Sequence, residues 1–484
     1  MDDCPKGFGS RACYYSYWGK AQPIDGDHSA VYHLLIYHCL DVAAVGQILL
    51  SRHPALLQRL SQQMQMPKHQ AQAWMVFLLG IHDLGKFAET FQQIRPDLRQ
   101  HFWPHVPIKR SHYSIRHDSL GAMLWEQYLY NRIFGESASE DLVEFSTDTL
   151  TRWLNPVFGH HGWPPSTPEE IKFHFAEQDQ QSALAFVQDW QALIQPDWSL
   201  AAELDSQRRW RQQQNKTSWL MAGVSVLADW LGSNRDIFQY RCESMSLAEY
   251  WNDVALPNAE RAVEDAGVLP KQQQTLKPLQ ALFPVISDPT PLQRQCESMV
   301  IGEEPQLFIL EDVTGAGKTE AALMLAHRLM SVGLAQGIYI GLPTMATANA
   351  MYERMSKAYR ALYNDEETPS LVLSHSARHL SELFQQSLLN DQPDNQNYAD
   401  EENISAQCNR WLADNRKKAL LADVGVGTID QALLGILPAR HQSLRLLGLL
   451  NKVLILDEVH AYDAYTSELL KRLIEFHGAL GGSV

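Results

Sequence analysis

Two sets of residues in this chain have the types and spacing that chemistry on phosphates requires. The first is the doublet His82-Asp83, which follows an apolar stretch. The second is the loop 315–319, with the sequence G-A-G-K-T, followed further along by Asp457-Glu458. A His-Asp doublet can give metal ions a nitrogen ligand and a bridging carboxylate, and the glycine-rich loop is typical of phosphate binding. Together they indicate metal-dependent phosphodiester chemistry coupled to an ATP-driven nucleic-acid motor.

Other histidine and aspartate residues could complete a metal site around the doublet. The pair His160-His161 is flanked by glycines, which permit a turn from which both rings reach one metal cluster. His38 and Asp229 lie in apolar helical stretches, where a bare carboxylate is costly without a partner. His117 begins another helix. Each of these residues alone is more often a core histidine, a surface acid or a helix cap than a ligand, so the prediction depends on the whole set.

The composition of this set indicates which ions it would hold. Histidine and aspartate without a thiolate favour Mn, Fe, Co or Ni over Mg, because imidazole suits borderline metals. Two such ions would clamp a phosphodiester and lower the pKa of a water between them. Lys86 would lie on the same helical face as the doublet and could meet a phosphate oxygen. The simpler alternative for His82-Asp83 is a helix C-terminal cation beside its partner.

The glycine-rich loop supplies what a nucleotide site needs. Gly315 and Gly317 leave room for phosphate oxygens, and a helix that begins at Lys318 adds its dipole. Lys318 can reach the β- and γ-phosphates, and the Thr319 hydroxyl can ligate Mg²⁺. The form T-G-x-G-K-T, which begins at Thr314, is typical of helicases.

Two further features support a nucleotide site in this half. Asp457 and Glu458 follow the apolar run 453–456, so Asp457 would hold Mg²⁺ and Glu458 would orient the attacking water. Gln293, in the sequence P-T-P-L-Q, resembles the adenine-reading glutamine of helicases. An exposed glutamine after a proline-capped helix start is the simpler alternative.

The bulk properties of the chain set limits on its class. With 484 residues, 45% of them hydrophobic and 20% charged, it is long enough for two or three globular domains. The net charge of −16 argues against a passive nucleic-acid coat, although a local basic groove can still bind phosphates. We expect no signal peptide and no membrane span. Six cysteines without paired spacing favour a reduced, cytoplasmic chain.

The apolar pattern changes midway along the chain. Before residue 250 it has helical spacing, as at 31–50, 71–81, 119–130 and 219–232. Afterwards short apolar runs alternate with helical segments such as 320–330, and these runs lie at 307–310, 337–342 and 453–456. The alternation predicts βαβ units with a mainly parallel sheet. The expected fold class is therefore multidomain, with an all-α domain followed by an α/β domain.

We expect residues 1–255 to form the metal domain and residues 281–484 the nucleotide domain. Residues 256–280 between them are polar and contain prolines, as an inter-domain linker does. The segment 390–403 is rich in Asp, Asn, Gln and Glu, which predicts a mobile surface insertion.

The motifs resemble the CRISPR-associated nuclease–helicases of type I systems, in the branch with an N-terminal HD domain fused to a superfamily 2 DExH helicase. The run 342–351, L-P-T-M-A-T-A-N-A-M, and the run 426–434, V-G-T-I-D-Q-A-L-L, are far more specific than the phosphate loop. The resemblance covers essentially the whole chain, and it also includes 17–20, 37–44, 82–86, 159–162, 228–230, 314–319 and 457–460. It implies an HD-type domain followed by the first RecA-like helicase domain.

The resemblance also implies which residues act and on what. One metal ion would be held by His38, His82, Asp83 and Asp229. The other would be held by Asp83, His117, His160 and His161, with His112 or His105 as alternatives to His117. The family's activity would be cleavage of single-stranded DNA and ATP-driven 3′→5′ translocation, by a monomer recruited to a guide-RNA surveillance complex (Cascade) that has opened an R-loop.

One departure from the family pattern affects the motor. The sequence stops at Val484, shortly after the acidic pair, so we expect the second RecA-like domain and its arginine finger to be absent. Hydrolysis and translocation would then be severely impaired in a fragment, a truncated product or half of a split protein. Two other functions fit the motifs: a nucleotide phosphohydrolase with a regulatory phosphate-loop half, and a non-catalytic docking subunit of the surveillance complex.

Overall fold

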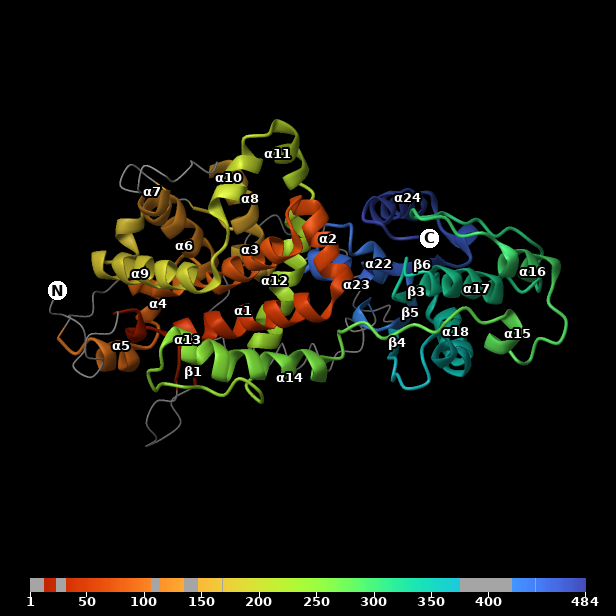
Figure 1. Cartoon of the computed structure of the whole chain (residues 1–484), viewed down its shortest axis with the longest axis horizontal. Helices are drawn as coiled ribbons and strands as arrows, with labels where there is room; N and C mark the ends of the chain where they lie inside the picture. Colours follow the sequence, from red (N-terminus) through yellow and green to blue (C-terminus); the bar gives the residue numbers. More distant parts are fainter. Residues whose placement is uncertain are drawn as a thin grey trace. The chain divides into compact units, whose positions relative to one another are not determined.

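In the computed structural model the chain forms two compact units, one up to Ala266 and one that comprises the described residues from Gly267 onward (Figure 1). The structure describes residues 13–22, 32–105, 113–134, 147–167, 169–374, 420–439 and 441–484. The insertion predicted at 390–403 lies outside these ranges. Within them, no helix combines the length and the apolar character that crossing a membrane requires.

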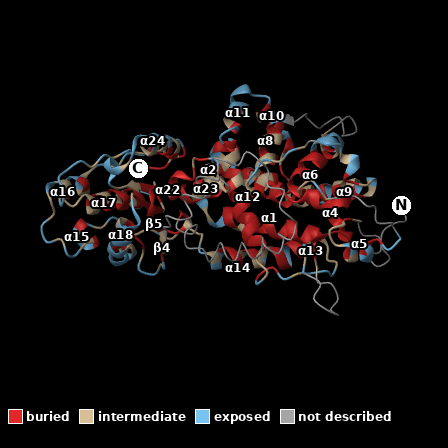
Figure 2. Cartoon of the chain, turned by 180° about the vertical axis from the view of Figure 1, so that it is seen from behind, coloured by how far each residue is buried: buried red, intermediate tan, exposed pale blue. Residues whose placement is uncertain are grey.

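The first unit is helical and is built around α1 (Leu35–Arg52). Every residue from Leu35 to Gly46 is buried, as expected for a helix that is apolar all round. α1 packs against α3 (Lys68–Gly80), α12 (Ser218–Gly232) and α14 (Leu256–Ala266). Figure 2 shows α1 and α12 as largely buried. These central helices carry several of the candidate ligands and hold them in a rigid core.

The helices expected at 71–81, 119–130 and 219–232 are confirmed as α3, α6 and α12, and the one at 31–50 is confirmed as α1 after a short strand. α6 (His117–Leu124) continues as a π-helical turn, η3 (Trp125–Leu129). The other helices of the unit are η1 (Cys13–Ser16), α2 (Pro54–Met64), η2 (Leu84–Phe87), α4 (Glu89–Gln92), α5 (Pro96–Phe102), α7 (Tyr130–Phe134), α8 (Thr147–Phe158), η4 (Gly159–His161), η5 (Ile171–Phe173), α9 (Glu177–Ile194), α10 (Trp198–Asp205), α11 (Arg208–Gln214), α13 (Leu247–Tyr250) and η6 (Trp251–Ala255). Its strands β1 (Trp18–Ala21) and β2 (Tyr32–Leu34) pair antiparallel.

The beginning of the predicted linker is helical instead. Residues 256–266 form α14, which buries Ala259, Ala262 and Val263 and packs against α1. The buried residues are small and spaced by three or four, so one apolar stripe suffices for packing while the rest of the helix stays polar. Because most residues of this stretch are polar, the apolar stripe was not recognised in the sequence.

The second unit contains a four-stranded sheet in which every pair is parallel. The strand order is β4-β5-β3-β6, which confirms the α/β class and the strands expected at 337–342 and 453–456. The strands are β3 (Gly337–Leu342), β4 (Leu371–Ser374), β5 (Val424–Thr428) and β6 (Lys452–Leu456). The helices are α15 (Leu279–Leu282), α16 (Pro291–Ser298), α17 (Lys318–Ser331), α18 (Met345–Ala358), η7 (Tyr359–Leu362), α22 (Ile429–Leu433), α23 (Gln442–Leu449), η9 (Val459–Ala461) and α24 (Ala464–Ala479).

The strand predicted at 307–310 is wrong. This segment has no regular secondary structure, and Leu307 and Ile309 are 57% and 81% exposed. Phe308 packs against the core and donates its backbone N–H to the carbonyl of Val484. Leu310 also packs against a core cluster, so two alternate residues of the apolar run face the interior without forming a strand.

The cysteines depart from the expectation at one position. Cys13 is disulfide-bonded, whereas Cys39, Cys242 and Cys296 are free. Spacing along the sequence does not decide which thiols meet, since that depends on how the fold brings the Cα atoms together.

Candidate metal centre and nucleotide loop

Helix ends and short turns bring the candidate metal ligands into one buried cluster in the first unit. His38 lies within α1, Asp229 lies near the end of α12, and the His82-Asp83 doublet lies between α3 and η2. The remaining ligands come from the start of α6 and from η4. Each of the seven side chains is at most 8% exposed, and they are His38, His82, Asp83, His117, His160, His161 and Asp229.

Asp83 lies at the middle of this cluster and presents one oxygen to each side. Its Oδ2 is 3.2 Å from Nε2 of His38 and 3.4 Å from Nε2 of His82. Its Oδ1 is 3.4 Å from Nε2 of His117 and 3.8 Å from Nε2 of His160. The carboxylate therefore separates two sets of histidines, which is the arrangement that a bridging ligand requires.

Three groups of potential ligands each lie within 4.8 Å of one another: His38, His82 and Asp229 on one side of Asp83, His117, His160 and His161 on the other, and His82, Asp83 and His160 across the middle. In the first set, Oδ1 of Asp229 is 3.8 Å from Nε2 of both His38 and His82. In the second set, Nε2 of His161 is 2.8 Å from Nε2 of His117. Histidine nitrogens bind a metal ion such as Zn²⁺ at about 2.1 Å. Two nitrogens as close as those of His117 and His161 can therefore bind the same ion.

The hydrogen bonds of the cluster favour metal binding. The Nδ1 atoms of His82 and His160 lie 2.7 and 2.9 Å from the carbonyls of Leu79 and Val157. A proton on each Nδ1 satisfies that carbonyl and leaves the Nε2 lone pair directed into the cluster. Nε2 of His82, Oδ1 of Asp83 and Oδ2 of Asp229 are buried without a hydrogen-bond partner. Buried polar atoms without partners are costly, and cations held on the two sides of Asp83 would satisfy these atoms.

The electrostatics keep these groups in the protonation states that a metal needs. Burial lowers the pKa of His38, His117 and His161 well below the ordinary value of 6.5. Burial alone would raise the pKa of Asp83, but the charge of Lys86 and the neighbouring histidines hold it well below its usual range. His38, His117 and His161 are therefore neutral imidazoles near the ionised carboxylate of Asp83.

The lowered pKa values of these buried histidines predict how the stability of the metal-free chain depends on pH. In the unfolded chain they titrate near 6.5, whereas in the folded chain their pKa is lower. Below 6.5 the unfolded state therefore binds more protons, and stability falls by up to about 1.4 kcal/mol per histidine per pH unit. Melting with a chelator from about pH 8 to about pH 5 should show a midpoint that decreases below about pH 6.5. A midpoint that stays constant over this range would contradict the burial of neutral histidines.

Lys86 is buried beside the cluster. It is 3% exposed, its Nζ is 3.2 Å from Oδ2 of Asp83, and it donates to the carbonyl of Gly19 at 3.1 Å. The position on the same face as the doublet is as expected. Its Nζ also lies 5.4 Å from the centroid of the Phe91 ring, and its contact with Asp83 holds that carboxylate in its orientation and charge state.

Two residues beside Asp229 were not predicted from the sequence. The Ser233 hydroxyl lies 3.3 Å from Oδ1 of Asp229 and also hydrogen-bonds Nζ of Lys20 on β1. This chain of contacts fixes the carboxylate from behind, as outer-shell partners of metal ligands do. Ser233 follows Asp229 by one helical turn, so a polar residue four positions after a buried acid is the signal that could have identified it.

Of the three histidines considered for this ligand position, the structure describes His117 and His105. His117 is 3% exposed and faces both Asp83 and His161. His105 lies in an exposed turn and belongs to neither set of potential ligands. His112 lies outside the described residues. Among the described histidines of this segment, His117 is the one with ligand geometry.

The close approach of η2 to α6 sets the spacing between the doublet and His117. A Cβ atom added at Gly85 would lie 1.8 Å from the carbonyl oxygen of His117 and 2.6 Å from the backbone nitrogen of Gly121. Both neighbours are backbone atoms and cannot rotate away. The glycine of the sequence H-D-L-G-K is therefore required for this packing, and a side chain there would move the doublet away from His117.

In the second unit, the glycine-rich loop has the expected form. Gly315 and Gly317 have φ values of 85° and 73°, in the left-handed region that favours glycine, and α17 begins at Lys318. Nζ of Lys318 donates to the carbonyls of Asp312 and Val313 at 2.9 and 3.0 Å. The ammonium is thus held at the loop by contacts that phosphate oxygens could replace.

Gln293 lies against this loop. Its Oε1 accepts from the backbone N–H of Thr290 at 3.0 Å, and its Nε2 donates to the carbonyl of Gly317 at 3.3 Å. Thr290 was not singled out in the sequence, but its hydroxyl donates to the carbonyl of Ala316 at 2.9 Å. Both residues therefore fasten the start of α16 to the phosphate loop, in addition to any contact with a base.

The other candidate nucleotide residues lie in the glycine-rich loop, at the start of α17 and after β6. Thr314 is exposed in the loop, and the Thr319 hydroxyl lies 3.4 Å from Nη1 of Arg354 on α18. Asp457 follows β6 and donates its N–H to the carbonyl of Gly341 on β3. Glu458 has a φ of 54°, an unusual conformation for a residue with a side chain and one that is common at functional sites.

Comparison with known protein families matches the first unit. Residues 18–238 match the family described as "Cas3, HD domain". Over 493 aligned residues the chain is 31% identical to the CRISPR-associated endonuclease/helicase Cas3 of Escherichia coli strain K12, with 97% of this chain and 53% of that protein covered. The chain therefore spans about half the length of this curated relative.

Solved structures extend the similarity to both units. The crystal structure of a CRISPR-associated protein matches with a TM-score of 0.76 and 29% identity, over 97% of this chain and 51% of that chain. The crystal structure of T. fusca Cas3 with AMPPNP matches with a TM-score of 0.72 and 25% identity, over 97% of this chain and 50% of that chain. The helical unit and the parallel-sheet unit thus have the fold of these proteins.

Proposed function

The chain belongs to the Cas3 family, and on this premise we propose that its first unit is a metal-dependent nuclease that cuts single-stranded DNA. The observation that carries the proposal is the position of Asp83, with one oxygen toward each of two sets of buried histidines. A phosphodiester needs positive charge on both the attacking and the leaving side. Two ions that share Asp83 would meet this need.

The first ion would be held by His38, His82, Asp83 and Asp229, and the second by Asp83, His117, His160 and His161. The ions would supply an activated water and neutralise charge on the phosphate. The side chains fix the ligand orientations: the carbonyls of Leu79 and Val157 hold two imidazoles in the binding tautomer, and Lys86 keeps Asp83 ionised. Mn, Fe, Co or Ni suits this mixed nitrogen and oxygen set.

We further propose that the second unit binds ATP with Mg²⁺. Lys318 and Thr319 would contact the phosphates and the Mg²⁺ ion, while Asp457 and Glu458 would complete the hydrolytic site. The similarity to T. fusca Cas3 with AMPPNP supports a nucleotide in this unit. ATP-driven 3′→5′ translocation would in addition need a second RecA-like domain to close the cleft.

Family membership also suggests the setting in which the nuclease would act. We propose a cytoplasmic monomer that is recruited to a guide-RNA surveillance complex, where base pairing selects the sequence and the nuclease recognises an exposed single strand. This division of labour would allow the metal site to cut without reading bases.

The nuclease proposal can be tested with circular single-stranded DNA, which has no ends for an exonuclease. The purified chain should linearise the circles with Mn²⁺ or Co²⁺ and leave them intact with a chelator. Free deoxynucleotides in parallel reactions test the alternative of a nucleotide phosphohydrolase. Release of phosphate from them without DNA cleavage would replace the nuclease proposal with that alternative. No turnover of either substrate, with retained binding to the surveillance complex, would favour a docking subunit.

Lys318→Ala should separate the two proposed activities. Hydrogen bonds to charged groups are worth about 1.5–3 kcal/mol, so ATP binding should weaken by at least about tenfold. Metal-dependent nicking of circular DNA should continue at the wild-type rate, because Lys318 belongs to the second unit. Fluorescent ATP titrations and nicking assays on the same preparation measure both effects. A parallel loss of nicking would mean that the nuclease depends on the nucleotide unit.

A further inference from the structure

The first unit carries a dense group of cations on the outer face of α11. The segment 206–228 contains four basic residues and no acidic one, although the whole chain has a net charge of −16. Arg152 on α8 adds a fifth cation, because its Nη1 donates to the backbone carbonyl of Arg211 at 3.0 Å. We define these residues as the α11 patch: Arg152, Arg208, Arg209, Arg211 and Lys216.

The cations of α11 differ from three other surface cations of the same unit. Arg52, Arg261 and Lys172 each form an ion pair with a nearby carboxylate. Within the described part of the chain, no ion pair is formed by the exposed residues Arg208, Arg209, Arg211 and Lys216. Like charges three residues apart on a helix repel each other, so this arrangement lowers stability and needs another explanation.

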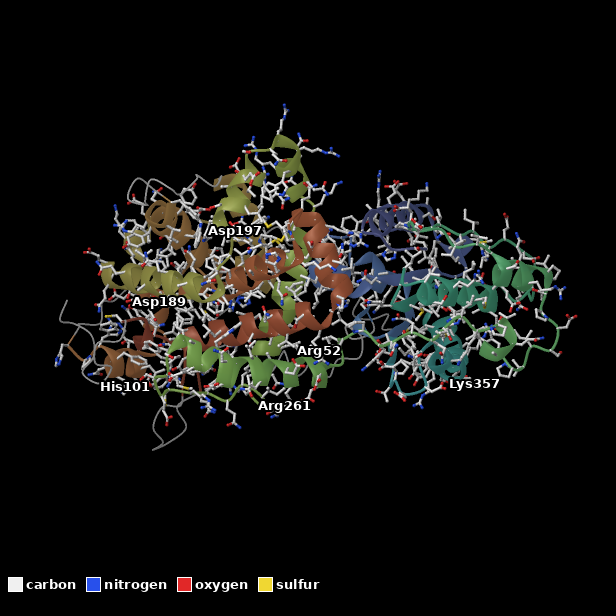
Figure 3. The ribbon with its side chains drawn as sticks, viewed as in Figure 1. Arg52, His101, Asp189, Asp197, Arg261 and Lys357 are labelled. Carbon is white, nitrogen blue, oxygen red and sulfur yellow. The ribbon has the colours of Figure 1, made fainter. Side chains whose placement is uncertain are left out.

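The inner face of α11 holds the helix rigidly in place. Trp210 is buried and its Nε1 donates to the carbonyl of Met64 at 2.7 Å. Gln214, one turn later, is also buried and accepts from Nε1 of Trp153 at 3.1 Å. Figure 1 shows α11 as a projection from this unit, and Figure 3 shows nitrogen-tipped side chains extending from it. The cations are therefore presented on a fixed, convex support.

We propose that the α11 patch binds the phosphate backbone of duplex DNA. A group of cations without ion pairs complements a polyanion, and backbone contacts of this kind need no base recognition. Binders of single strands combine a groove with exposed aromatic rings for stacking. α11 offers a convex face, and its one aromatic residue, Trp210, is buried. Phosphates on the outside of a double helix fit this surface better than a flexible single strand does.

The α11 patch lies outside the metal centre, and α12 connects the two regions. Lys216 lies just before α12, and Asp229 lies eleven residues after Ser218 on the same helix. At about 1.5 Å per residue, the start of α12, next to Lys216, lies about 16 Å from Asp229 along the helix axis. Duplex held there would lie near a strand that enters the metal site. The binding itself requires neither a metal ion nor cleavage, so it can be tested independently of the nuclease proposal.

The test uses fluorescence anisotropy of a labelled DNA duplex with the whole chain and a chelator, which prevents metal-dependent cleavage. R208A/R209A/R211A should weaken duplex binding by at least about tenfold at low salt, and the salt dependence should become shallower by about 0.9 for each phosphate that is no longer neutralised. R208K/R209K/R211K should restore most of the affinity, because a point charge suffices for phosphate. The melting midpoints of all variants verify that the fold is retained.

The matched control is R52A/R261A/K172A, which removes the same formal charge from cations that already face carboxylates. Figure 3 shows Arg52 and Arg261 on α1 and α14, away from α11. This control should bind duplex like the wild type. Equal losses in both triple variants would overturn the proposal, because net charge would then explain them. Duplex binding that is unchanged in R208A/R209A/R211A, or affected less than binding of a single strand, would also overturn it.

Discussion

Asp83→Asn is expected to abolish metal-dependent cleavage of circular single-stranded DNA. Loss of a residue that only hydrogen-bonds a metal ligand costs about 10- to 100-fold in metal affinity or activity. Asp83 is proposed to bind both ions directly, so its loss should cost more. The neutral amide offers one acceptor where the carboxylate offers two. Cleavage should therefore decrease by more than about a hundredfold, measured under single-turnover conditions together with the metal content of the folded protein.

Asp41→Asn is the matched control for this substitution. Asp41 lies within α1 and is as buried as Asp83, but its oxygens contact His33 and Tyr250 instead of the ligand histidines. Asp41→Asn should lower the melting temperature and retain both metal ions. If Asp83→Asn kept full cleavage, or if Asp41→Asn lost metal to the same extent, the assignment of Asp83 as the shared ligand would be wrong.

Gly85→Ala should have the second largest effect, although it adds only one methyl group. The new Cβ would lie 1.8 Å from a backbone oxygen, so η2 and α6 must move apart. Overpacking of this kind costs about 1–3 kcal/mol and occasionally more. The movement would separate Asp83 from His117, whose Nε2 is now 3.4 Å from Oδ1. We expect a lower melting temperature and metal affinity reduced about 10- to 100-fold, measured by thermal melting and by titration with Mn²⁺.

Gly159→Ala provides the comparison, since Gly159 also lies beside the ligand histidines. A Cβ at that position would lie 3.6 Å from its nearest neighbour, the Cα of Pro164, which is an ordinary contact. This variant should fold and bind metal nearly as the wild type does. Equal behaviour of the two variants would show that the approach of η2 to α6 does not control the site.

The sequence predicts the parts of this fold that depend on local periodicity. The apolar stretches of α1, α3 and α12 are long enough for their spacing to identify helices, and β3 and β6 are short apolar runs between helices. Periodicity fails as a guide where burial depends on distant segments. Leu307 and Ile309 belong to an apolar run but are exposed, while α14 is buried through a stripe of only three small or branched residues.

The candidate site shows a similar division. The types of the ligand residues could be read from the sequence because histidine and aspartate in apolar surroundings are unusual. Their arrangement could not, because it depends on contacts over long sequence separations, such as His38 with Asp83 and His117 with His161. Nor does the sequence show which ring nitrogen of His82 and His160 carries the proton, because this depends on the carbonyls of Leu79 and Val157.

The position of Asp83 between the two sets of histidines has a thermodynamic consequence. In the proposed two-metal site one carboxylate would serve both sets, so the free energy of binding at one position would depend on whether the other is filled. Linkage requires that this dependence be reciprocal: each ion changes the affinity of the other by the same factor. A substitution at His161 would therefore alter the measured affinity of an ion beside His38, and neither position can be titrated as an independent site.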